Sequence, residues 1–174
     1  MRIKTIYYNG NGVDGREIGG VGFAPDAVII FSDPSSGASL TFRTKEMSGD
    51  VTANFRADVA WEANMIQALS ADGFQIGTNG NVNSTGFFYY AICIKRTAAN
   101  DFATFQYTGD AADGKKITIG FKPDFIVSKS NTAITGAAAF SSRPDGNRGF
   151  MHFAGANRDD LYGAYTEENG FTVY

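Results

Sequence analysis

The chain of 174 residues repeats itself, and this repeat constrains its fold more than any other feature of the sequence. Four short landmarks occur twice in the same order, and the second copy follows the first at an offset that falls from 99 to 97 residues. The paired landmarks are Tyr8–Asn11 with Tyr107–Asp110, Asp14–Gly15 with Asp113–Gly114, Gly22–Ala27 with Gly120–Phe125, and Asp72–Phe74 with Asn169–Phe171. Because the order is preserved, the sequence predicts two related units in tandem.

Each landmark predicts a turn beside a β-strand. In the Gly-Phe-x-Pro-Asp landmark, proline fixes φ at the turn and an apolar run follows, which predicts buried strands at Ala27–Phe31 and Phe125–Val127. The tyrosine landmark closes a preceding strand, which is predicted at Thr5–Tyr8 and at Ala103–Tyr107. The Asx-Gly-Phe landmark predicts a tight turn before another strand.

The strongest strand pattern is the run Phe87–Lys95. Its alternate residues form two faces, one beginning at Phe88 and the other at Tyr89, and both faces are apolar. A strand of this kind is typical of a central position with cover on both sides, so we expect both faces to be buried. The stretch Asp58–Ala71 is ambiguous and is compatible with a short helix.

The spacing of turn residues, about one turn every 8–12 residues, is typical of a β-sandwich. The composition agrees, since the chain holds 21 glycines and 14% aromatic residues but only 19% charged residues. We therefore predict an all-β fold of two related β-sandwich-like, jelly-roll-like units, 1–97 and 98–174, which can pack as one compact body. The second unit is truncated, because it lacks a counterpart of Phe87–Lys95.

Charge and the rare residue types exclude several classes of function. A net charge of −3 and a pI near 5.1 argue against a nucleic-acid binder, which usually presents a basic face. The single Cys93 excludes a disulfide within the chain and a cysteine-rich zinc site, and the single His152 excludes a site with two imidazoles. No run has the length of a membrane span and no signal peptide is visible, so we expect synthesis in a reducing cytoplasm without membrane insertion.

No set of residues predicts catalysis. His152 has no nucleophile motif near it, and Cys93 lies in the most apolar strand, where cysteine acts as a small hydrophobic residue. Four acidic residues invite a comparison with the paired carboxylates of a glycosidase, but they lie in loop-like sequence that has no counterpart in the first unit. These residues are Asp159, Asp160, Glu167 and Glu168. We therefore favour a solvated acidic patch and predict no enzyme activity and no catalytic, cofactor-binding or metal-binding residue.

Clusters of glycine with Asn or Asp at the start of each unit leave two interpretations open. The clusters contain Asn9, Asn11 and Asp14 in the first unit and Asp110 and Asp113 in the second. Such side chains usually form turns by hydrogen bonding to nearby backbone, which is the interpretation we favour. The alternative is a weak calcium site, although the spacing does not fit the EF-hand pattern.

Candidate ligand contacts lie away from the repeated landmarks. Exposed aromatic side chains flanked by Asn and Asp suit stacking on a carbohydrate and hydrogen bonding to it. The candidate ligand-contact residues are Trp61, Tyr162, Tyr165, Asp159 and Asp160. For Trp61 we favour the alternative, a position in the core of the sandwich.

The landmarks of the first unit, taken in order, form a longer pattern that begins again at Tyr107. The pattern consists of Tyr8-Asn9-Gly10-Asn11-Gly12, Gly22-Phe23-Ala24-Pro25-Asp26, Asp72-Gly73-Phe74-Gln75-Ile76-Gly77, Val82-Asn83-Ser84-Thr85-Gly86 and Tyr89-Tyr90-Ala91-Ile92-Cys93. In this order and over nearly the whole chain, it resembles a repeated module of tailed-phage and prophage virion proteins of the tail-fibre-like kind.

This resemblance implies a non-enzymatic structural or surface protein of a phage virion, either a capsid decoration or a tail or fibre component. The expected location is the virion, after synthesis in the host cytoplasm, and no cofactor is implied. The alternative is a carbohydrate-binding module for adhesion to a host surface glycan, and a degraded glycan hydrolase is the third reading.

The expected partners follow from the truncated second unit and from the resemblance. A sandwich without a central strand exposes unpaired backbone groups and apolar side chains, so we expect this edge to be covered. The cover can come from the first unit, from a second subunit or from another virion protein. We expect other virion proteins as partners and a homo-oligomer, with a trimer favoured because phage appendages often resemble that arrangement. The run Phe171–Tyr174 is expected to be docked as a strand.

Overall fold

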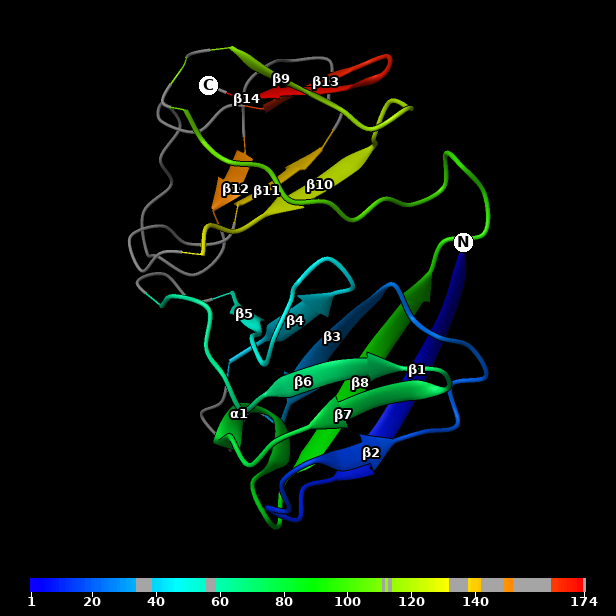
Figure 1. Cartoon of the computed structure of the whole chain (residues 1–174), viewed down its shortest axis with the longest axis vertical. Helices are drawn as coiled ribbons and strands as arrows, with labels where there is room; N and C mark the ends of the chain where they lie inside the picture. Colours follow the sequence, from blue (N-terminus) through cyan, green and yellow to red (C-terminus); the bar gives the residue numbers. More distant parts are fainter. Residues whose placement is uncertain are drawn as a thin grey trace.

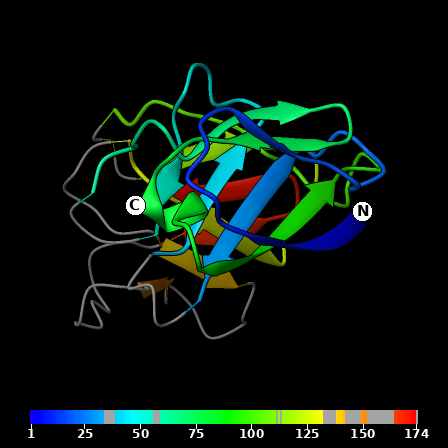
Figure 2. The ribbon, with the colours of Figure 1, turned by 90° about the horizontal axis from the view of Figure 1, so that it is seen from below.

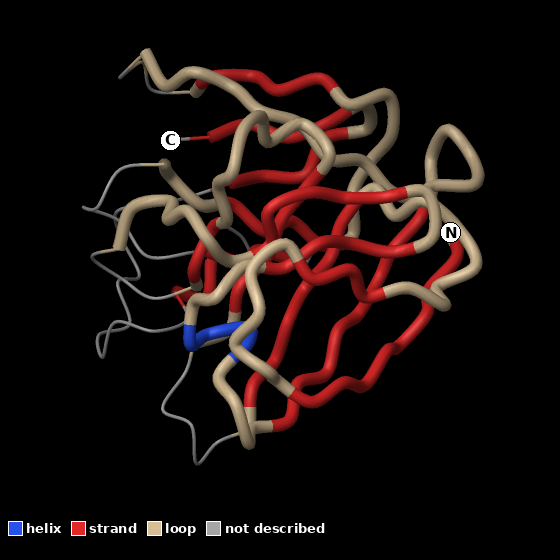
Figure 3. Tube along the Cα trace, turned by 60° about the horizontal axis from the view of Figure 1, so that its bottom comes forward, coloured by secondary structure: helices blue, strands red, loops and turns tan. Residues whose placement is uncertain are grey.

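The computed structural model describes residues 1–33, 39–55, 59–110, 112, 114–131, 138–141, 149–151 and 164–173, with the backbone alone at 138–141, 149–151 and 164–166. This part of the chain is all-β, and its strands pair in antiparallel fashion (Figures 1 and 3). The strands are β1 (Arg2–Asn9), β2 (Arg16–Ile18), β3 (Ala27–Ser32), β4 (Thr41–Thr44), β5 (Ala53–Asn54), β6 (Ile66–Ser70), β7 (Gly73–Ile76), β8 (Phe88–Lys95), β9 (Lys115–Thr118), β10 (Phe125–Ser128), β11 (Ala138–Ser141), β12 (Gly149–Met151), β13 (Ala164–Glu167) and β14 (Gly170–Val173).

Helix is almost absent from the described ranges. They contain a single helical turn, α1 (Gly80–Asn83), which begins after the N-cap Asn79. The Asn79 side chain accepts a hydrogen bond from the backbone N–H of Asn81, as an N-cap residue usually does. Within these ranges no helix is long and apolar enough to cross a membrane.

β8 lies inside the larger sheet, which has the order β1-β8-β3-β4-β5. It pairs along its length with β1 on one side and with β3 on the other. The registers run from Arg2 opposite Lys95 to Asn9 opposite Phe88, and from Ala27 opposite Ile94 to Ser32 opposite Tyr89. The predicted central position of this strand is therefore confirmed.

The smaller sheet of the N-terminal half has the order β2-β7-β6. β6 and β7 form a hairpin around the turn Ala71–Asp72, as the Asx-Gly-Phe landmark predicts. Gly73 begins β7 at a point where β2 passes very close, so that a Cβ there would lie 1.9 Å from the carbonyl oxygen of Ile18. Any larger residue at this position would push the two strands apart.

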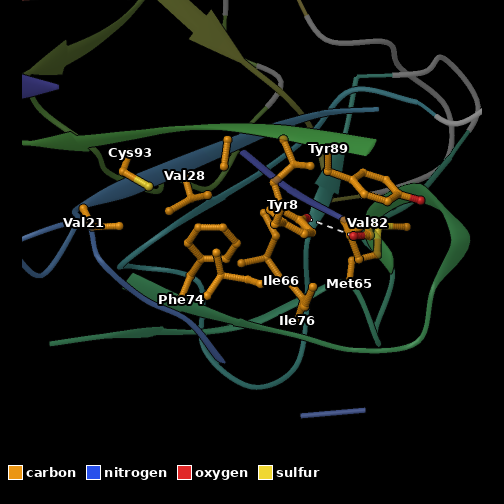
Figure 4. Packing of buried hydrophobic residues seen from close by; sticks show 13 residues of the cluster. Tyr8, Val21, Val28, Met65, Ile66, Phe74, Ile76, Val82, Tyr89 and Cys93 are labelled. Atoms are coloured by element: carbon orange, nitrogen blue, oxygen red, sulfur yellow. Dashed lines mark hydrogen bonds between the residues drawn. The ribbon is translucent and has the colours of Figure 1, made fainter. Parts of the chain in front are cut away.

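The core lies between these two sheets. Figure 2, seen from below, shows the β6–β7 hairpin on one side of the long strands β1, β3 and β8. The buried side chains between the sheets, most of them labelled in Figure 4, are Tyr8, Ile18, Val21, Val28, Ile30, Met65, Ile66, Phe74, Ile76, Val82, Tyr89, Ala91 and Cys93. Their removal from water stabilises a β-sandwich-like body formed by residues 2–95.

Two buried tyrosines attach α1 to this core. The Tyr8 hydroxyl donates a hydrogen bond to the carbonyl oxygen of Val82 at 2.9 Å (Figure 4). The Tyr89 hydroxyl donates to the carbonyl oxygen of Gly80 at 2.8 Å and accepts from the backbone N–H of Ser84 at 2.9 Å. The two rings are stacked with their centroids 5.3 Å apart. Each buried hydroxyl is therefore hydrogen-bonded, as burial requires.

The C-terminal strands repeat part of this pairing. β9, β14 and β13 are joined in the order in which β2, β7 and β6 are joined, and β10 pairs with β11 as β3 pairs with β4. The close approach at Gly73 recurs at Gly170, where a Cβ would lie 2.0 Å from the carbonyl oxygen of Ile117. Among the described residues no strand pair joins 2–95 to 115–173, and Figure 1 shows these two groups of strands at opposite ends of the molecule.

Some sequence predictions of local structure are wrong. Residues 103–107 are not a strand, although the equivalent stretch of the first unit lies in β1. Phe125–Val127 does form a strand, but only its middle residue Ile126 is buried: Phe125 is 63% exposed and Val127 is 40% exposed. The reason lies in pairing, because in the first unit β8 joins β1 to β3, and no strand in the described C-terminal part takes its place.

The remaining local expectations have mixed outcomes. The ambiguous stretch Asp58–Ala71 is not helical where it is described, since residues 59–65 are irregular and 66–70 form β6. At the end of the chain β14 is the central strand of its sheet, with Phe171 and Thr172 buried. The expected docking of Phe171–Tyr174 is therefore confirmed for Phe171–Val173, and Tyr174 lies outside the described residues.

Candidate functional site

The face of the larger sheet that points away from the core has an unusual composition. On β1, β3 and β8 this face holds the residues that alternate with the core residues. We call it the outer face, and it consists of Ile3, Thr5, Tyr7 and Asn9 on β1, Ala27, Ile29 and Phe31 on β3, and Phe88, Tyr90, Ile92 and Ile94 on β8. The prediction that β8 is covered on both sides is wrong, because Phe88 and Tyr90 are 42% and 50% exposed.

Four exposed aromatic side chains lie together on this outer face, and we call them the aromatic patch: Tyr7, Phe31, Phe88 and Tyr90. Tyr90 on β8 lies opposite Tyr7 on β1 and opposite Phe31 on β3. The ring of Tyr7 is stacked on that of Phe88 at 5.6 Å and lies 5.4 Å from that of Tyr90. The patch therefore spans three hydrogen-bonded strands, which hold its backbone in place.

The outer face carries no charged residue. An antiparallel sheet with one face in water usually presents polar side chains on that face. On β1 the charged Arg2 and Lys4 occupy the opposite alternation, and the Arg2 guanidinium lies 4.8 Å from the ring centroid of Phe23. Depletion of charge together with enrichment in aromatic residues is the composition found at the centre of protein interfaces.

The size of the aromatic patch can be compared with that of known interfaces. An aromatic side chain covers about 150–250 Å², so exposed fractions between 40% and 54% give a patch of about 400 Å². This is about half the area that one partner contributes to an interface of standard size. Neighbouring residues of the outer face, Ile3 above all, extend the apolar surface further. The outer face is therefore large enough to form the centre of a protein contact.

In the part of the chain that the structure describes, the residues considered for catalysis and metal binding do not form a site. Cys93 is fully buried in the core, and burial raises the pKa of its thiol to about 12, so the reactive thiolate is scarce at neutral pH. His152, Asp159 and Asp160 lie outside the described residues. In the ranges that are described, no group of three His, Cys, Asp or Glu side chains is placed to hold a metal ion.

In the Gly-Asx clusters, Asn11 and Asp110 hydrogen-bond to nearby backbone, as the favoured interpretation predicts. The side-chain oxygen of Asn11 accepts a hydrogen bond from the backbone N–H of Val13 at 3.0 Å. In the same way Asp110 accepts a hydrogen bond from the backbone N–H of Ala112 at 3.1 Å. The pKa of the Asp110 carboxyl is lowered by a hydrogen bond from Lys115 and, after it, by this bond from Ala112. The carboxylate of Asp14 accepts instead from the amide of a distant Gln67, and Asp113 lies outside the described residues.

A second polar cluster lies where β3 begins. The buried Asp26 accepts hydrogen bonds from the backbone N–H of Arg96 at 2.7 Å and from Lys45 Nζ at 3.1 Å, and Lys95 Nζ lies 3.7 Å away. Burial alone would raise the pKa of Asp26, but these hydrogen bonds and positive charges outweigh it and hold the pKa below its ordinary value. The carboxylate thereby joins the ends of β3, β4 and β8, beside an open polar hollow of about 340 Å³.

Of the five candidate ligand contacts that the sequence predicts, the structure describes the side chain of Trp61 alone. Trp61 lies in the chain between β5 and β6 and is half-buried. Its indole N–H is buried with no hydrogen-bond partner in the described chain. Tyr165 lies in β13, where only the backbone is described. Asp159, Asp160 and Tyr162 lie outside the described residues, so the set stays a prediction.

The sequence reasoning missed the outer face because it assigned both faces of Phe87–Lys95 to the core. One pattern could have revealed it. The alternate residues Ile3, Thr5 and Tyr7 of β1 carry no charge, although the edge strand beside an exposed face normally carries polar or charged residues there. Comparison of the chain with protein-family models, with curated proteins and with solved structures finds no match.

Proposed function

We propose that this protein is a non-enzymatic structural or surface component of a tailed-phage virion, as a capsid decoration or as a tail or fibre component. It is made in the host cytoplasm and is located in the virion, where the aromatic patch packs against a neighbouring virion protein. The observation that carries this proposal is the uncharged outer face, on which four aromatic side chains are exposed across three paired strands.

The physical case for a contact rests on desolvation and rigidity. Covering the aromatic patch removes about 400 Å² of apolar surface from water without burying any charge. The four side chains stand on strands held by hydrogen bonds at β1–β8 and β8–β3, so little backbone entropy is lost on binding. A protein surface fits this face better than a small ligand does, because a small ligand usually needs a concave site.

We further propose that the chain consists of two related jelly-roll-like sandwich units, residues 1–97 and 98–174, and that copies assemble into a homo-oligomer, with a trimer as the leading arrangement. The shared strand order of β2-β7-β6 and β9-β14-β13 supports the repeat. So does the recurrence of the close glycine contact at Gly73 and Gly170. Trimeric assembly rests on the resemblance to phage appendages.

The alternative function is a carbohydrate-binding module for adhesion to a host surface glycan. One observation favours it: the stacked rings of Tyr7 and Phe88 form an exposed platform, and the Tyr7 and Tyr90 hydroxyls lie beside it. Sugar rings stack on such platforms, but they also need several hydrogen-bonding groups nearby. Of the outer-face residues, only Thr5, Asn9 and the two tyrosines supply such groups.

The test is immunolabelling of purified virions of the source phage, viewed by electron microscopy, with an antibody against the chain. The expected result is a label at a defined position on heads or tails. Virions without label, from a lysate that contains the protein, would contradict a virion function. The trimer is tested separately, by measuring the mass of the purified chain in solution.

The role of the aromatic patch is tested with a matched pair of substitutions. Tyr90→Lys places a charge at the centre of the patch, and we expect it to abolish incorporation into virions while the fold is kept. Glu17→Lys changes an exposed charge on β2, away from the patch, and is expected to be incorporated normally. Normal incorporation of Tyr90→Lys would refute the patch as the contact. Glycan-array binding that Tyr7→Ala abolishes would favour the alternative function.

A further inference from the structure

Positive charge gathers around the polar hollow beside the start of β3. The hollow has a volume of about 340 Å³ and is lined by Asp26, Lys45, Lys95 and the stretch 96–99. Arg96 adds a third cationic side chain to the two lysines, and Asp26 is the one acidic residue of the lining. The lining thus has a surplus of two positive charges, although the whole chain carries a net charge of −3.

Backbone pairing holds the two lysines on either side of Asp26. The backbone N–H of Asp26 donates to the carbonyl oxygen of Ile94 at 2.8 Å, and its carbonyl oxygen accepts from the N–H of Lys45 at 2.9 Å. Both ammonium groups face the carboxylate oxygen Oδ1 of Asp26, with Lys45 Nζ at 3.1 Å and Lys95 Nζ at 3.7 Å. Oδ2 accepts from the backbone N–H of Arg96 at 2.7 Å. The ends of β3, β4 and β8 therefore fix where these charges lie.

Asp26 does not neutralise the positive charge around it. Its carboxylate supplies one negative charge for two ammonium groups, and both of its oxygens already accept hydrogen bonds. Two of the five N–H groups of Arg96 donate to backbone carbonyl oxygens of 98–99, which orients the guanidinium without adding negative charge. The side chains of Lys45 and Lys95 are 50% and 36% exposed, so their remaining N–H groups can reach a ligand.

The charge and the donors of the hollow match a phosphate group. A phosphate monoester carries a charge of about −1.5 to −2 at neutral pH and presents three strong acceptor oxygens. Lysine binds phosphate as a point charge, and the guanidinium of arginine adds planar donors. A single carboxylate would leave one positive charge uncompensated. The volume lies at the lower end of the range for small-molecule sites, about 300–1,000 Å³, so the hollow also has room for a small polar carrier of the phosphate.

We propose that this hollow binds a phosphate group, either as the free ion or as the phosphate of a monosaccharide. Lys45, Lys95 and Arg96 contact the phosphate oxygens. Asp26 is a positioning residue, because its carboxylate offsets the repulsion between the two ammonium groups and holds them together when no ligand is bound. The site does not involve the aromatic patch, and it goes beyond the proposed virion function without depending on it.

The ligand is tested by NMR titration of the full ¹⁵N-labelled chain at neutral pH and constant ionic strength. The four probes are inorganic phosphate, glucose 6-phosphate, glucuronate and glucose. We expect both phosphates to shift the amide signals of residues 26, 45 and 95–99, with a dissociation constant of about 1 mM. Glucuronate should bind about tenfold more weakly because it carries one charge, and glucose should not bind. Tighter binding of glucose 6-phosphate than of phosphate identifies a carried phosphate as the ligand, whereas equal binding identifies the free ion.

Substitutions of opposite charge effect test the residues. Lys45→Ala removes one cation and should weaken phosphate binding about tenfold, whereas Lys45→Arg keeps the charge and should restore binding. Asp26→Asn removes the negative charge, so it should tighten binding severalfold, a gain that a purely structural role of the cluster does not predict. The control is Lys116→Ala on β9, which removes a 74% exposed cation away from the hollow and should leave binding unchanged.

The amide spectrum of each free variant shows whether it is folded. Asp26→Asn removes a buried carboxylate with several partners, so the pair Lys45→Ala and Lys45→Arg decides the outcome if that variant does not fold. Phosphate shifts spread over the whole chain would overturn the proposal, as would equal shifts with glucose or equal affinities of Lys45→Ala and the wild type. No virion is needed for these measurements, so their failure is distinct from failure of the proposed function.

Discussion

Removal of one hydroxyl, in Tyr89→Phe, tests the idea that buried tyrosines hold α1 against the sandwich. The Tyr89 ring is fully buried, and phenylalanine would keep its apolar contacts. The change removes the hydrogen bond to the carbonyl oxygen of Gly80 and the bond from the backbone N–H of Ser84. We therefore expect a loss of stability with no change in the packing of the core.

The magnitude follows from the two bonds. Each contributes about 1 kcal/mol net, and groups left unpaired in a partly buried region add a desolvation cost. Gly80 is exposed and water can replace its lost bond, whereas Ser84 is half-buried. The expected loss is about 2 kcal/mol of unfolding free energy. For a urea dependence of about 2 kcal/mol per M, this lowers the midpoint of unfolding by about 1 M.

The assay is urea unfolding followed by the fluorescence of Trp61, the single tryptophan, which lies in the first unit. The matched control is Tyr90→Phe, the next residue of β8, whose side chain points out of the sandwich and is half-exposed. This control should change stability by less than about 0.5 kcal/mol. Equal effects of the two substitutions, or an unchanged midpoint for Tyr89→Phe, would refute the anchoring role of the Tyr89 hydroxyl.

Two further predictions concern charged groups buried beside the sandwich. Arg43→Met removes a buried guanidinium that donates hydrogen bonds to four backbone carbonyl groups, including those of Met47 and Gly49 at 2.8 and 2.7 Å. We expect urea unfolding to show a loss of about 3 kcal/mol in the free energy of unfolding. The control Arg16→Met on β2 should lose much less. The pKa of Asp26 is lowered in the folded protein, so its stabilising contribution is complete above the ordinary carboxyl pKa of about 3.9 and is lost as pH falls through the lower folded value. The free energy of unfolding, measured from pH 6 down to pH 2, should therefore fall less steeply for Asp26→Asn than for the wild type. Identical slopes would contradict this prediction.

Local features of the fold were predictable because they depend on residues close in sequence. The turn at Ala71–Asp72 follows from Asp72-Gly73, and the strands that begin at Ala27 and at Phe125 follow from the proline turn and the apolar run after it. The central position of β8 was predictable from its length and apolar character. These features need only backbone preferences and alternation, which a sequence displays directly.

The candidate site was predicted less well. The sequence identified the alternation of Phe88 and Tyr90 but could not tell whether anything covers that face. Burial of a strand face depends on which other segments pack there, and those segments are distant in the chain. The exposure of the outer face therefore follows from the tertiary structure, in which the β6–β7 hairpin packs against the opposite side of the sheet.

The repeat, the all-β class and the turns at the landmarks are predictable from the amino-acid sequence, because they depend on short residue patterns. Whether such a pattern becomes a strand depends on the tertiary structure. Arg2–Asn9 and 101–108 are related segments, yet only the first is a strand, because it has β8 as a partner. A β-strand gains its hydrogen bonds from a neighbour rather than from its own residues, so the same local signal gives different structures in the two halves.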